Sequence, residues 1–382
     1  MLLLQKSNKC LNILFLAPRY HTNQNPIVSL LENKGHKIFF HSKYIGKIEN
    51  HDNIKPLVFE ESFFSRALKL IFFFKKDKHL FYLPKLIKYY LYLKKLNFDI
   101  AIIRLHGRLN VYILSVLIRF ILNKKVIFYD QANSDLRHIK GLSILKIIKK
   151  IEFYTRLFLF SARWFTPLHN KKNILPKNCY YVPFYVQNRP FIKKNFKKIK
   201  ILTIAKFQNR KNLLKATQII NFLKDKYNLE FTIVGEVSKK EHEINLIRLE
   251  KYIREKNLEQ IVSIFTNVSN NEIKNFYINH NLFFLPSYNE PASISLLEAM
   301  SYGLPVICHK TCGTSTYVKN GFNGFVLNNI SFNEINLILD KIKNIQTLEV
   351  LSKNCLHYQK QYFSDKVYYN HFLNLINSFT DK

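Results

Sequence analysis

Two glutamates, Glu290 and Glu298, are the residues whose types and spacing most clearly allow chemistry. The apolar run 281–286 predicts a short buried strand before them, and residues 292–302 predict a helix that carries Glu298. Pro291 suits the first turn of such a helix, where a missing N–H costs nothing. A strand, a turn and a helix in this order are typical of an open α/β sheet, whose ligands bind beyond the strand ends.

The start of this predicted helix is a candidate anion site. Free backbone N–H groups and the positive end of the helix dipole favour a phosphate there. The N–H groups concerned belong to Ser293, Ile294 and Ser295. A neighbouring carboxylate accepts hydrogen bonds from sugar hydroxyls, so the glutamate pair suits a ligand with both a diphosphate and polyols. A structural alternative stays open, in which Glu290 only complements the helix dipole and Glu298 is a solvated helix residue.

The stretch 290–324 resembles the signature of the retaining glycosyltransferases of family 4, also called glycosyltransferase group 1. That signature is a glutamate, seven residues and a second glutamate, followed by Ala-Met, Gly-x-Pro-Val and Gly-x-x-Gly. The matching residues here are Glu290, Glu298, Ala299, Met300, Gly303, Pro305, Val306, Gly321 and Gly324. The resemblance implies an α/β protein of GT-B fold, with two Rossmann-like parallel-sheet domains facing each other across a cleft. It also implies that Glu298 holds the ribose of a nucleotide sugar and that Glu290 holds the hexose.

Lys206 and Lys211 follow the predicted strand 199–205 at the spacing where the family carries Arg and Lys. Two cations beside a strand end and a helix start can hold the two phosphates of a nucleotide diphosphate. Lysine in place of arginine keeps the charge but loses the bidentate fork. Asn267 and Val268 match the family's loop near the nucleotide base. The resemblance therefore implies a donor site made by all these residues, with Glu290, Lys206 and Lys211 as its catalytic members.

Acceptor contacts are expected in the first half of the chain, at the carboxyl ends of predicted strands. The candidates are His21, Asn23, Gln24, His106 and Asp130. Asp130 is favoured, because a carboxylate at a strand end can orient an acceptor hydroxyl. Family members often carry His-Asp at this point, whereas this chain has Tyr129 before Asp130. A buried core role for His106 and a surface-loop role for residues 19–24 remain open alternatives.

A length of 382 residues indicates two domains. The expected division is an acceptor-binding domain over 1–190, a nucleotide-sugar domain over 191–365, and a helix over 366–382 that packs back on the first domain. The polar, lysine-rich stretch 187–198 is the expected linker. A long basic, aromatic helix is predicted over 142–165.

The formal net charge of +33 favours polyanionic partners. Residues 63–96 mix basic and aromatic side chains, as do helices that lie on an anionic membrane. Base stacking between phosphate-binding lysines and an ordinary solvated helix face are alternatives for this stretch. A basic nucleic-acid-binding protein is thus a second functional hypothesis, and a catalytically silent transferase-like scaffold is a third.

No Asp-x-Asp pair occurs, and the five cysteines lack zinc-site spacing. We therefore expect no metal and no cofactor besides the nucleotide sugar as co-substrate. No apolar run is long enough for a membrane span, and the start of the chain is better interpreted as a buried strand than as a signal peptide. The expected location is cytoplasmic, peripheral on the inner face of the membrane. The expected reaction is hexose transfer to a glycan or lipid-linked acceptor, with retention, in bacterial surface polysaccharide or lipopolysaccharide synthesis.

Overall fold

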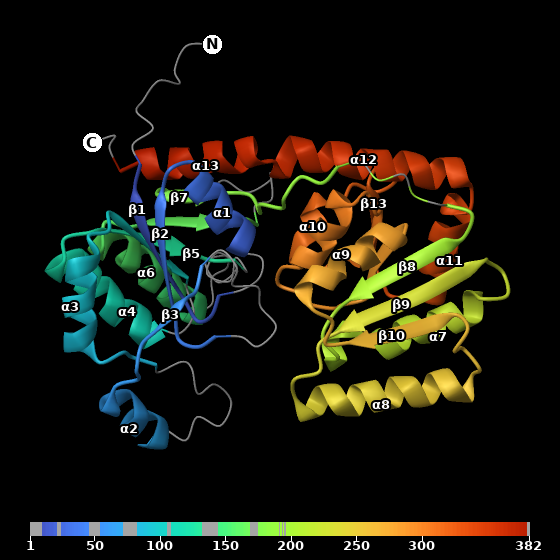
Figure 1. The fold of residues 1–382 in the computed structure, drawn as a ribbon, viewed down its shortest axis with the longest axis horizontal. Coiled ribbons are helices and arrows are strands. Elements are labelled where there is room, and N and C mark those ends of the chain that lie inside the picture. The colour runs from blue at the N-terminus through green and yellow to red at the C-terminus, as the bar shows by residue number, and fades with distance from the viewer. Residues whose placement is uncertain are drawn as a thin grey trace, which may run out of the picture. The chain divides into compact units, whose positions relative to one another are not determined.

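The computed structural model describes residues 10–20, 24–45, 54–71, 82–104, 108–131, 144–168, 175–190, 192, 194 and 196–379. The chain forms two compact units (Figure 1). Unit 1 is residues 1–183 together with 369–382, and unit 2 is residues 184–368. Each unit is built on a parallel sheet covered by helices. The predicted α/β architecture with two parallel sheets is therefore confirmed.

Unit 1 contains a seven-stranded parallel sheet in the order β3-β2-β1-β4-β5-β6-β7. Its strands are β1 (Asn12–Ala17), β2 (Lys37–Ser42), β3 (Leu57–Val58), β4 (Ile100–Arg104), β5 (Lys125–Tyr129), β6 (Arg163–Thr166) and β7 (Cys179–Tyr181). Its helices are α1 (Asn25–Asn33), α2 (Phe63–Ile71), α3 (Leu86–Leu96), α4 (Arg108–Val116), the π-helical continuation η2 (Leu117–Ile121) and α6 (Ile144–Leu159). The central strands are almost wholly buried, as expected of parallel strands covered on both faces.

The helix predicted over 142–165 is shorter than expected. It ends at Leu159, and residues 163–166 form strand β6 instead. Ser161, in a left-handed conformation with φ of +45°, makes the turn between them. Trp164 on β6 is fully buried and packs edge-on against Phe153 of α6, with ring centroids 5.8 Å apart. Burying these large rings between sheet and helix is what favours a strand here over further helix.

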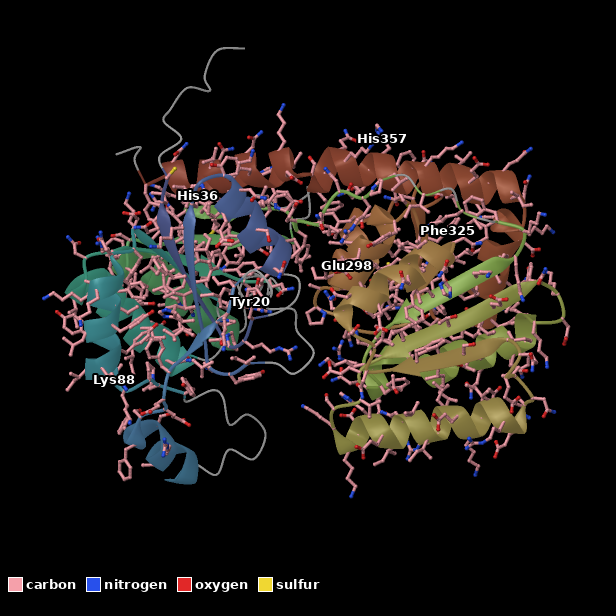
Figure 2. The ribbon with its side chains drawn as sticks, in the orientation of Figure 1. Tyr20, His36, Lys88, Glu298, Phe325 and His357 are labelled. Atoms are coloured by element: carbon pink, nitrogen blue, oxygen red, sulfur yellow. The ribbon has the colours of Figure 1, made fainter. Side chains whose placement is uncertain are left out.

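Two helices end the chain, α12 (Ile345–Phe363) and α13 (Asp365–Asn377). The part of α13 from Tyr369 onward packs in unit 1. The Tyr369 hydroxyl lies 3.1 Å from Nε2 of His36, a residue labelled beside this helix in Figure 2. Near the other end, Nε of Arg163 donates to Oγ of Ser378 at 3.0 Å. These polar contacts fix the end of the chain to the sheet of unit 1.

Unit 2 contains a six-stranded parallel sheet in the order β10-β9-β8-β11-β12-β13. Its strands are β8 (Ile199–Ile204), β9 (Leu229–Gly235), β10 (Val262–Thr266), β11 (Leu282–Leu285), β12 (Val306–His309) and β13 (Gly324–Leu327). Its other elements are the short 3₁₀ turns η3 (Asn209–Lys211) and η4 (Gly313–Tyr317) and the helices α7 (Leu213–Leu223), α8 (Lys240–Glu255), α9 (Asn270–Asn279), α10 (Ile294–Ser301), α11 (Phe332–Ile342) and α12. The strand order reverses between β8 and β11, which is where ligands bind in open α/β sheets.

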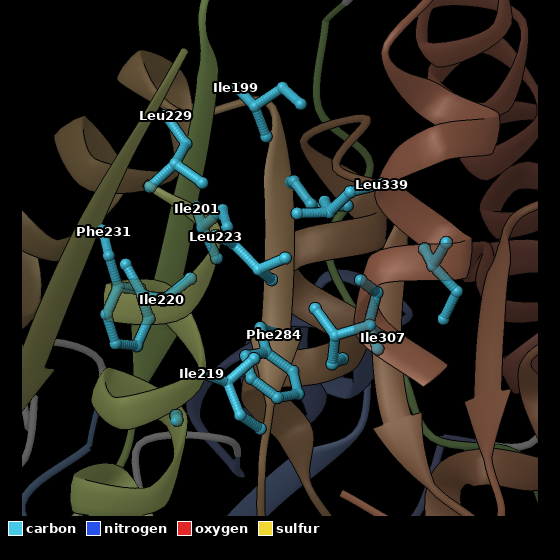
Figure 3. Close-up of a cluster of buried hydrophobic side chains, with 14 of the residues drawn as sticks. Ile199, Ile201, Ile219, Ile220, Leu223, Leu229, Phe231, Phe284, Ile307 and Leu339 are labelled. Atoms are coloured by element: carbon cyan, nitrogen blue, oxygen red, sulfur yellow. The ribbon is translucent and has the colours of Figure 1, made fainter. Parts of the chain in front are cut away.

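One continuous apolar core holds this sheet against its helices (Figure 3). Ile219, Ile220 and Leu223 of α7 are fully buried in the same cluster as Phe231 of β9 and Phe284 of β11. Each such side chain contributes about 1.5–3 kcal/mol of burial free energy. This packing fixes the carboxyl ends of β8, β9 and β11 relative to one another, and those ends carry the candidate site.

Candidate functional site

Glu290 follows β11 and receives two cationic side chains. Nη1 of Arg210 donates to Oε2 of Glu290 at 2.5 Å, and Nζ of Lys211 pairs with the same oxygen. Lys211 is only 8% exposed, and this burial lowers the pKa of its ammonium group, while the charge of Glu290 acts in the opposite direction. Two cations against one carboxylate leave this edge of the sheet with an excess positive charge, which suits a phosphate group.

The loop between β8 and α7 is fastened to the end of β11. The backbone N–H of Tyr288 donates to the carbonyl of Arg210 at 3.0 Å. Nδ2 of Asn212 donates to the carbonyl of Pro286 at 3.1 Å. Asn212 has a φ of +51°, a left-handed conformation that asparagine tolerates better than most residues. These bonds hold Arg210 and Lys211 in position beside Glu290.

Lys206 pairs with a residue at the end of β9, which lies on the other side of β8 from β11. Its Nζ lies 2.5 Å from Oε2 of Glu236, which directly follows β9. Close approach of the two strand ends depends on Gly235, because a Cβ there would lie 2.5 Å from the carbonyl oxygen of Ala205. The predicted lysine pair therefore lies at one edge of the sheet, but its members have different carboxylate partners.

Helix α10 begins at Ile294, slightly later than predicted, so Pro291 lies in the preceding loop and Ser293 is the N-cap residue. Oγ of Ser293 lies 3.0 Å from Oγ of Ser295, which in turn donates to the carbonyl of Ile204 at 3.4 Å. The first N–H groups of a helix have no partner within it. The predicted anion-binding helix start is thus held against the end of β8, the strand from which the cationic loop departs.

Glu298 lies within α10 (Figure 2), where its Oε2 accepts a hydrogen bond of 2.9 Å from the hydroxyl of Tyr277. Burial raises the pKa of Glu298, while the Tyr277 bond and the charge of Arg189 act in the opposite direction. The ring of Tyr277 stacks on Tyr302 at 5.1 Å, and the Arg189 guanidinium lies 5.2 Å from the Tyr302 centroid. Glu298 is therefore a half-buried carboxyl group oriented by Tyr277, which favours a binding role over that of a solvated helix residue.

Lys194, in the predicted linker, caps the helix that carries Tyr277. Its Nζ donates to the carbonyls of Tyr277, Ile278 and His280, at 2.7, 3.1 and 2.8 Å. These carbonyls lie at the carboxyl end of α9, where a cation also interacts favourably with the helix dipole. Burial lowers the pKa of Lys194 to about 7. Lys194 therefore positions the helix behind Glu298.

Asn267 and Val268 follow β10. Asn267 has a φ of +53°, and its backbone N–H donates to the carbonyl of Gly235 at 2.9 Å. Its Oδ1 accepts from the N–H of Val237 at 2.8 Å. Asn267 thus shapes the loop after β9, and Val268 is half-buried beside it.

The acceptor candidates are only partly placed. His21, Asn23 and His106 lie outside the described residues. Gln24 is buried immediately before α1, and Asp130 is 3% exposed at the carboxyl end of β5. The backbone N–H of Asp130 donates to the carbonyl of Phe165 at 3.1 Å. The roles of all five residues in acceptor binding stay predictions.

Within the part of the chain that the structure describes, no group of three or more His, Cys, Asp or Glu side chains is arranged to hold a metal ion. The five cysteines are free thiols. A search of the same described residues finds no helix with the length and apolarity of a membrane span.

Two parallel-sheet α/β units, one with cations and a glutamate pair at its carboxyl edge, are what the resemblance to proteins of GT-B fold predicts. Residues 186–361 match the family model described as "Glycosyl transferases group 1". The match covers every residue of the predicted donor site. The group 1 resemblance is confirmed for this part of the chain, whereas family 4 membership and retention stay predictions.

A curated relative and two solved structures are similar to this chain. The UDP-Gal:alpha-D-GlcNAc-diphosphoundecaprenol alpha-1,3-galactosyltransferase of Escherichia coli is 35% identical over 88 residues, which is 22% of this chain and 22% of that protein. A glycosyltransferase from Rickettsia africae has a TM-score of 0.70 at 14% identity, covering 98% of this chain and 99% of that one. Anabaena HepE in complex with UDP and glucose has a TM-score of 0.70 at 13% identity, covering 96% and 100%. The predicted GT-B fold is confirmed.

Proposed function

We propose that this protein is a retaining, family 4 glycosyltransferase that moves a hexose from a UDP-sugar to a lipid-linked acceptor in the synthesis of a bacterial surface polysaccharide. The observation that carries the proposal is the pairing of Arg210 and Lys211 with Glu290, inside the stretch that matches the glycosyltransferase model. The choice of uridine rests on similar proteins, since HepE is described with UDP and the Escherichia coli relative takes UDP-Gal.

Departure of the nucleotide diphosphate is the step that the cations serve. Negative charge grows on the leaving phosphate as the glycosidic bond breaks, and preorganised donors stabilise it. Arg210, Lys211 and Lys206 supply positive charge, and the N–H groups at the start of α10 supply further hydrogen bonds. In this proposal the reaction needs no divalent metal.

The two glutamates have different tasks in this proposal. Glu298 accepts hydrogen bonds from the ribose hydroxyls, and a carboxylate has enough lone pairs to keep the Tyr277 bond at the same time. Glu290 contacts the hexose and stays close to the cations that hold the diphosphate. The task of Glu298 requires an ionised carboxylate, and burial raises the pKa of this group, so donor binding is expected to weaken in acid.

Thermal shift measurements test the donor proposal. UDP, UDP-glucose and UDP-galactose should each raise the Tm, with and without EDTA, since a ligand that binds only the folded state stabilises it. Lys211→Met should remove the shift, whereas Lys251→Met, at a lysine with 72% side-chain exposure on α8, should keep it. If no nucleotide diphosphate or nucleotide sugar raises the Tm, the proposal is wrong.

We further propose that α2 and α3 attach the protein to the inner face of an anionic membrane. Large apolar side chains are exposed on them: Phe63 (85%), Phe64 (60%), Ile87 (79%) and Leu91 (52%). Lys88, Lys94 and Lys95 are exposed on the same helix as Ile87 and Leu91. Apolar side chains that enter the interface next to lysines that attract anionic lipid are typical of peripheral binding.

Vesicle sedimentation tests this attachment. The protein should bind phosphatidylglycerol vesicles and not phosphatidylcholine vesicles. Ile87→Asn should weaken the binding several-fold, whereas Ile247→Asn, on α8 and 59% exposed, should leave it unchanged. Equal loss in both variants, or no loss in either, contradicts a role for α3.

A further inference from the structure

A narrow cavity in unit 1 lies at the carboxyl ends of β1, β2 and β4 and is also lined by residues of α3 and α4. Strands β1 and β4 are the neighbours at which the strand order of this sheet reverses. In open α/β sheets, ligands bind in the crevice outside the strand ends at such a reversal. We name it the β1–β4 cavity; by topology, it corresponds in unit 1 to the donor site of unit 2.

The walls of the β1–β4 cavity are mostly apolar. Leu16, Phe59, Ile103, Val111 and Leu114 line it. Its volume is about 60 Å³, room for a few water molecules. A space of this volume admits the first few carbons of a chain, and neither a sugar ring nor a nucleotide base.

Two buried polar atoms at this cavity have no hydrogen-bond partner among the described residues, Nη1 of Arg104 and Oδ1 of Asn110. Nη2 of Arg104 donates to Oε1 of Gln131 at 2.5 Å, so only part of the guanidinium is satisfied. A buried polar atom without a partner costs about 1–3 kcal/mol, and more when it is charged. A ligand that accepts from Arg104 and donates to Asn110 would remove this cost.

The charge of the cavity lining is positive. Arg104 and Lys43 line it, and none of its described lining residues is Asp or Glu. His41 also lines it but adds no charge, because burial lowers its pKa to about 3 and its Nδ1 lies 3.0 Å from the Tyr89 hydroxyl. Asp130 and Arg19 act on Arg104 from outside the lining, with opposite signs. The lining therefore favours an anion attached to an apolar chain.

We propose that the β1–β4 cavity binds the phosphate end of a phosphorylated lipid, with one phosphate oxygen against Arg104, a protonated phosphate oxygen on Asn110 and the first carbons of the chain between the apolar walls. On the proposed function, this lipid is the end of the acceptor that remains in the membrane. That assignment rests on the proposed function, but binding itself needs no nucleotide and is measured without one.

Calorimetric titration of the full chain carrying Lys211→Met, which removes a cation from the proposed diphosphate site of unit 2, tests the cavity with farnesyl diphosphate, farnesol and inorganic pyrophosphate. Farnesyl diphosphate should bind, and the two fragments should each bind at least tenfold more weakly. Equal binding of pyrophosphate would show a site for free phosphate only, and equal binding of farnesol would show an apolar slot only. Either result overturns the proposal.

Two variants locate the binding. Arg104→Met should weaken farnesyl diphosphate binding at least tenfold, and Val111→Phe, which fills the slot, should do the same without touching the cation. Arg119→Met, at an arginine that donates to the side chain of the nearby Asn123, is the matched control and should bind normally. Unchanged binding in both cavity variants overturns the proposal.

The UDP-induced rise in Tm separates this proposal from the donor proposal. Variants that lose lipid binding but keep the UDP shift are folded and support the cavity. Lipid binding without any UDP shift would leave the cavity supported and the donor proposal wrong. If the wild-type protein shows the UDP shift but binds no farnesyl diphosphate, the donor proposal is supported and the cavity proposal is wrong.

Discussion

The hydroxyl of Tyr277 and Oε2 of Glu298 lie 2.9 Å apart, although α9 and α10 are separated by a strand and a loop in the sequence. The same hydroxyl lies 3.3 Å from the carbonyl of Ser295, in the first turn of α10. Tyr277 thus bonds to both the carboxyl group and the helix start of the proposed donor site. Because burial alone disfavours the charged carboxylate, this bond is what keeps Glu298 suited to accept sugar hydroxyls.

Glu298→Gln should make the protein more stable and less able to bind UDP. The folded-state pKa of Glu298 is raised above its unfolded value, so the folded state binds the proton more readily. Its contribution to stability is therefore present in acid and is lost as the pH rises through the folded pKa. Glutamine keeps an acceptor for Tyr277 without the charge.

Urea unfolding of wild type and Glu298→Gln between pH 4 and pH 8 checks this prediction. The variant should gain in unfolding free energy relative to wild type as the pH rises, while its UDP affinity falls on the order of tenfold, the usual worth of a hydrogen bond to a charged group. A variant that is less stable than wild type at pH 8 would contradict the argument.

Glu290→Gln should tighten pyrophosphate binding and abolish hexose transfer. The substitution releases Arg210 and Lys211 from their shared carboxylate, so a diphosphate meets two unneutralised cations. We expect an affinity gain on the order of tenfold, measured by calorimetry near pH 7. Glu236→Gln, which releases only Lys206, should give a smaller gain. Weaker pyrophosphate binding in Glu290→Gln would show that Glu290 holds the cations in place instead.

Gly235→Ala should weaken UDP binding because its Cβ would press on the loop that carries Lys206. The new atom would lie 2.5 Å from both the Ala205 carbonyl oxygen and the Phe207 ring, so the loop must move. We expect a loss of affinity on the order of tenfold, the effect of misplacing one charged contact. Gly321→Ala is the control, since its φ of +74° strains the backbone in open space and should lower only the Tm. Equal UDP affinity in all three proteins would exclude this role for Gly235.

Lys194→Met should change how stability depends on pH. The pKa of Lys194 is lowered to about 7 in the folded state, so between that pH and its ordinary value of 10.5 the unfolded state binds more protons. Wild-type stability should therefore gain from rising pH in this window, by at most about 1.4 kcal/mol per pH unit. Urea unfolding from pH 7 to pH 10 should show this gain in wild type and not in the variant. Parallel curves would mean that the three carbonyls keep Lys194 charged throughout.

Local sequence signals predicted the framework of the proposed donor site well. The apolar run before Pro286, the glycine at 303 and the proline at 305 delimit β11 and α10 to within about two residues. Each of these signals acts through the backbone of its own neighbours, so no tertiary information was needed. The parallel sheet follows in the same way from strands that alternate with helices.

Contacts between segments that are far apart in the sequence could not be predicted from it. Arg210 is adjacent to Lys211 in the sequence. Its ion pair with Glu290, which lies 80 residues later, depends on how the loop folds over β11. Lys194 appears in the sequence as one of several linker lysines, and nothing local distinguishes it from solvated neighbours. Strand β6 was not predicted, because its aromatic residues extend the apolar pattern of α6. The helix ends at a turn in which Ser161 has a left-handed backbone conformation, and the residue type does not indicate this.

Because Arg210 and Lys211 share one oxygen of Glu290, the proposed diphosphate site already contains a counter-ion of its own. The diphosphate of an incoming nucleotide then competes with Glu290 for these two cations, which are not unpaired before it binds. Ionic strength should accordingly affect nucleotide affinity less than the formal charge of the chain suggests.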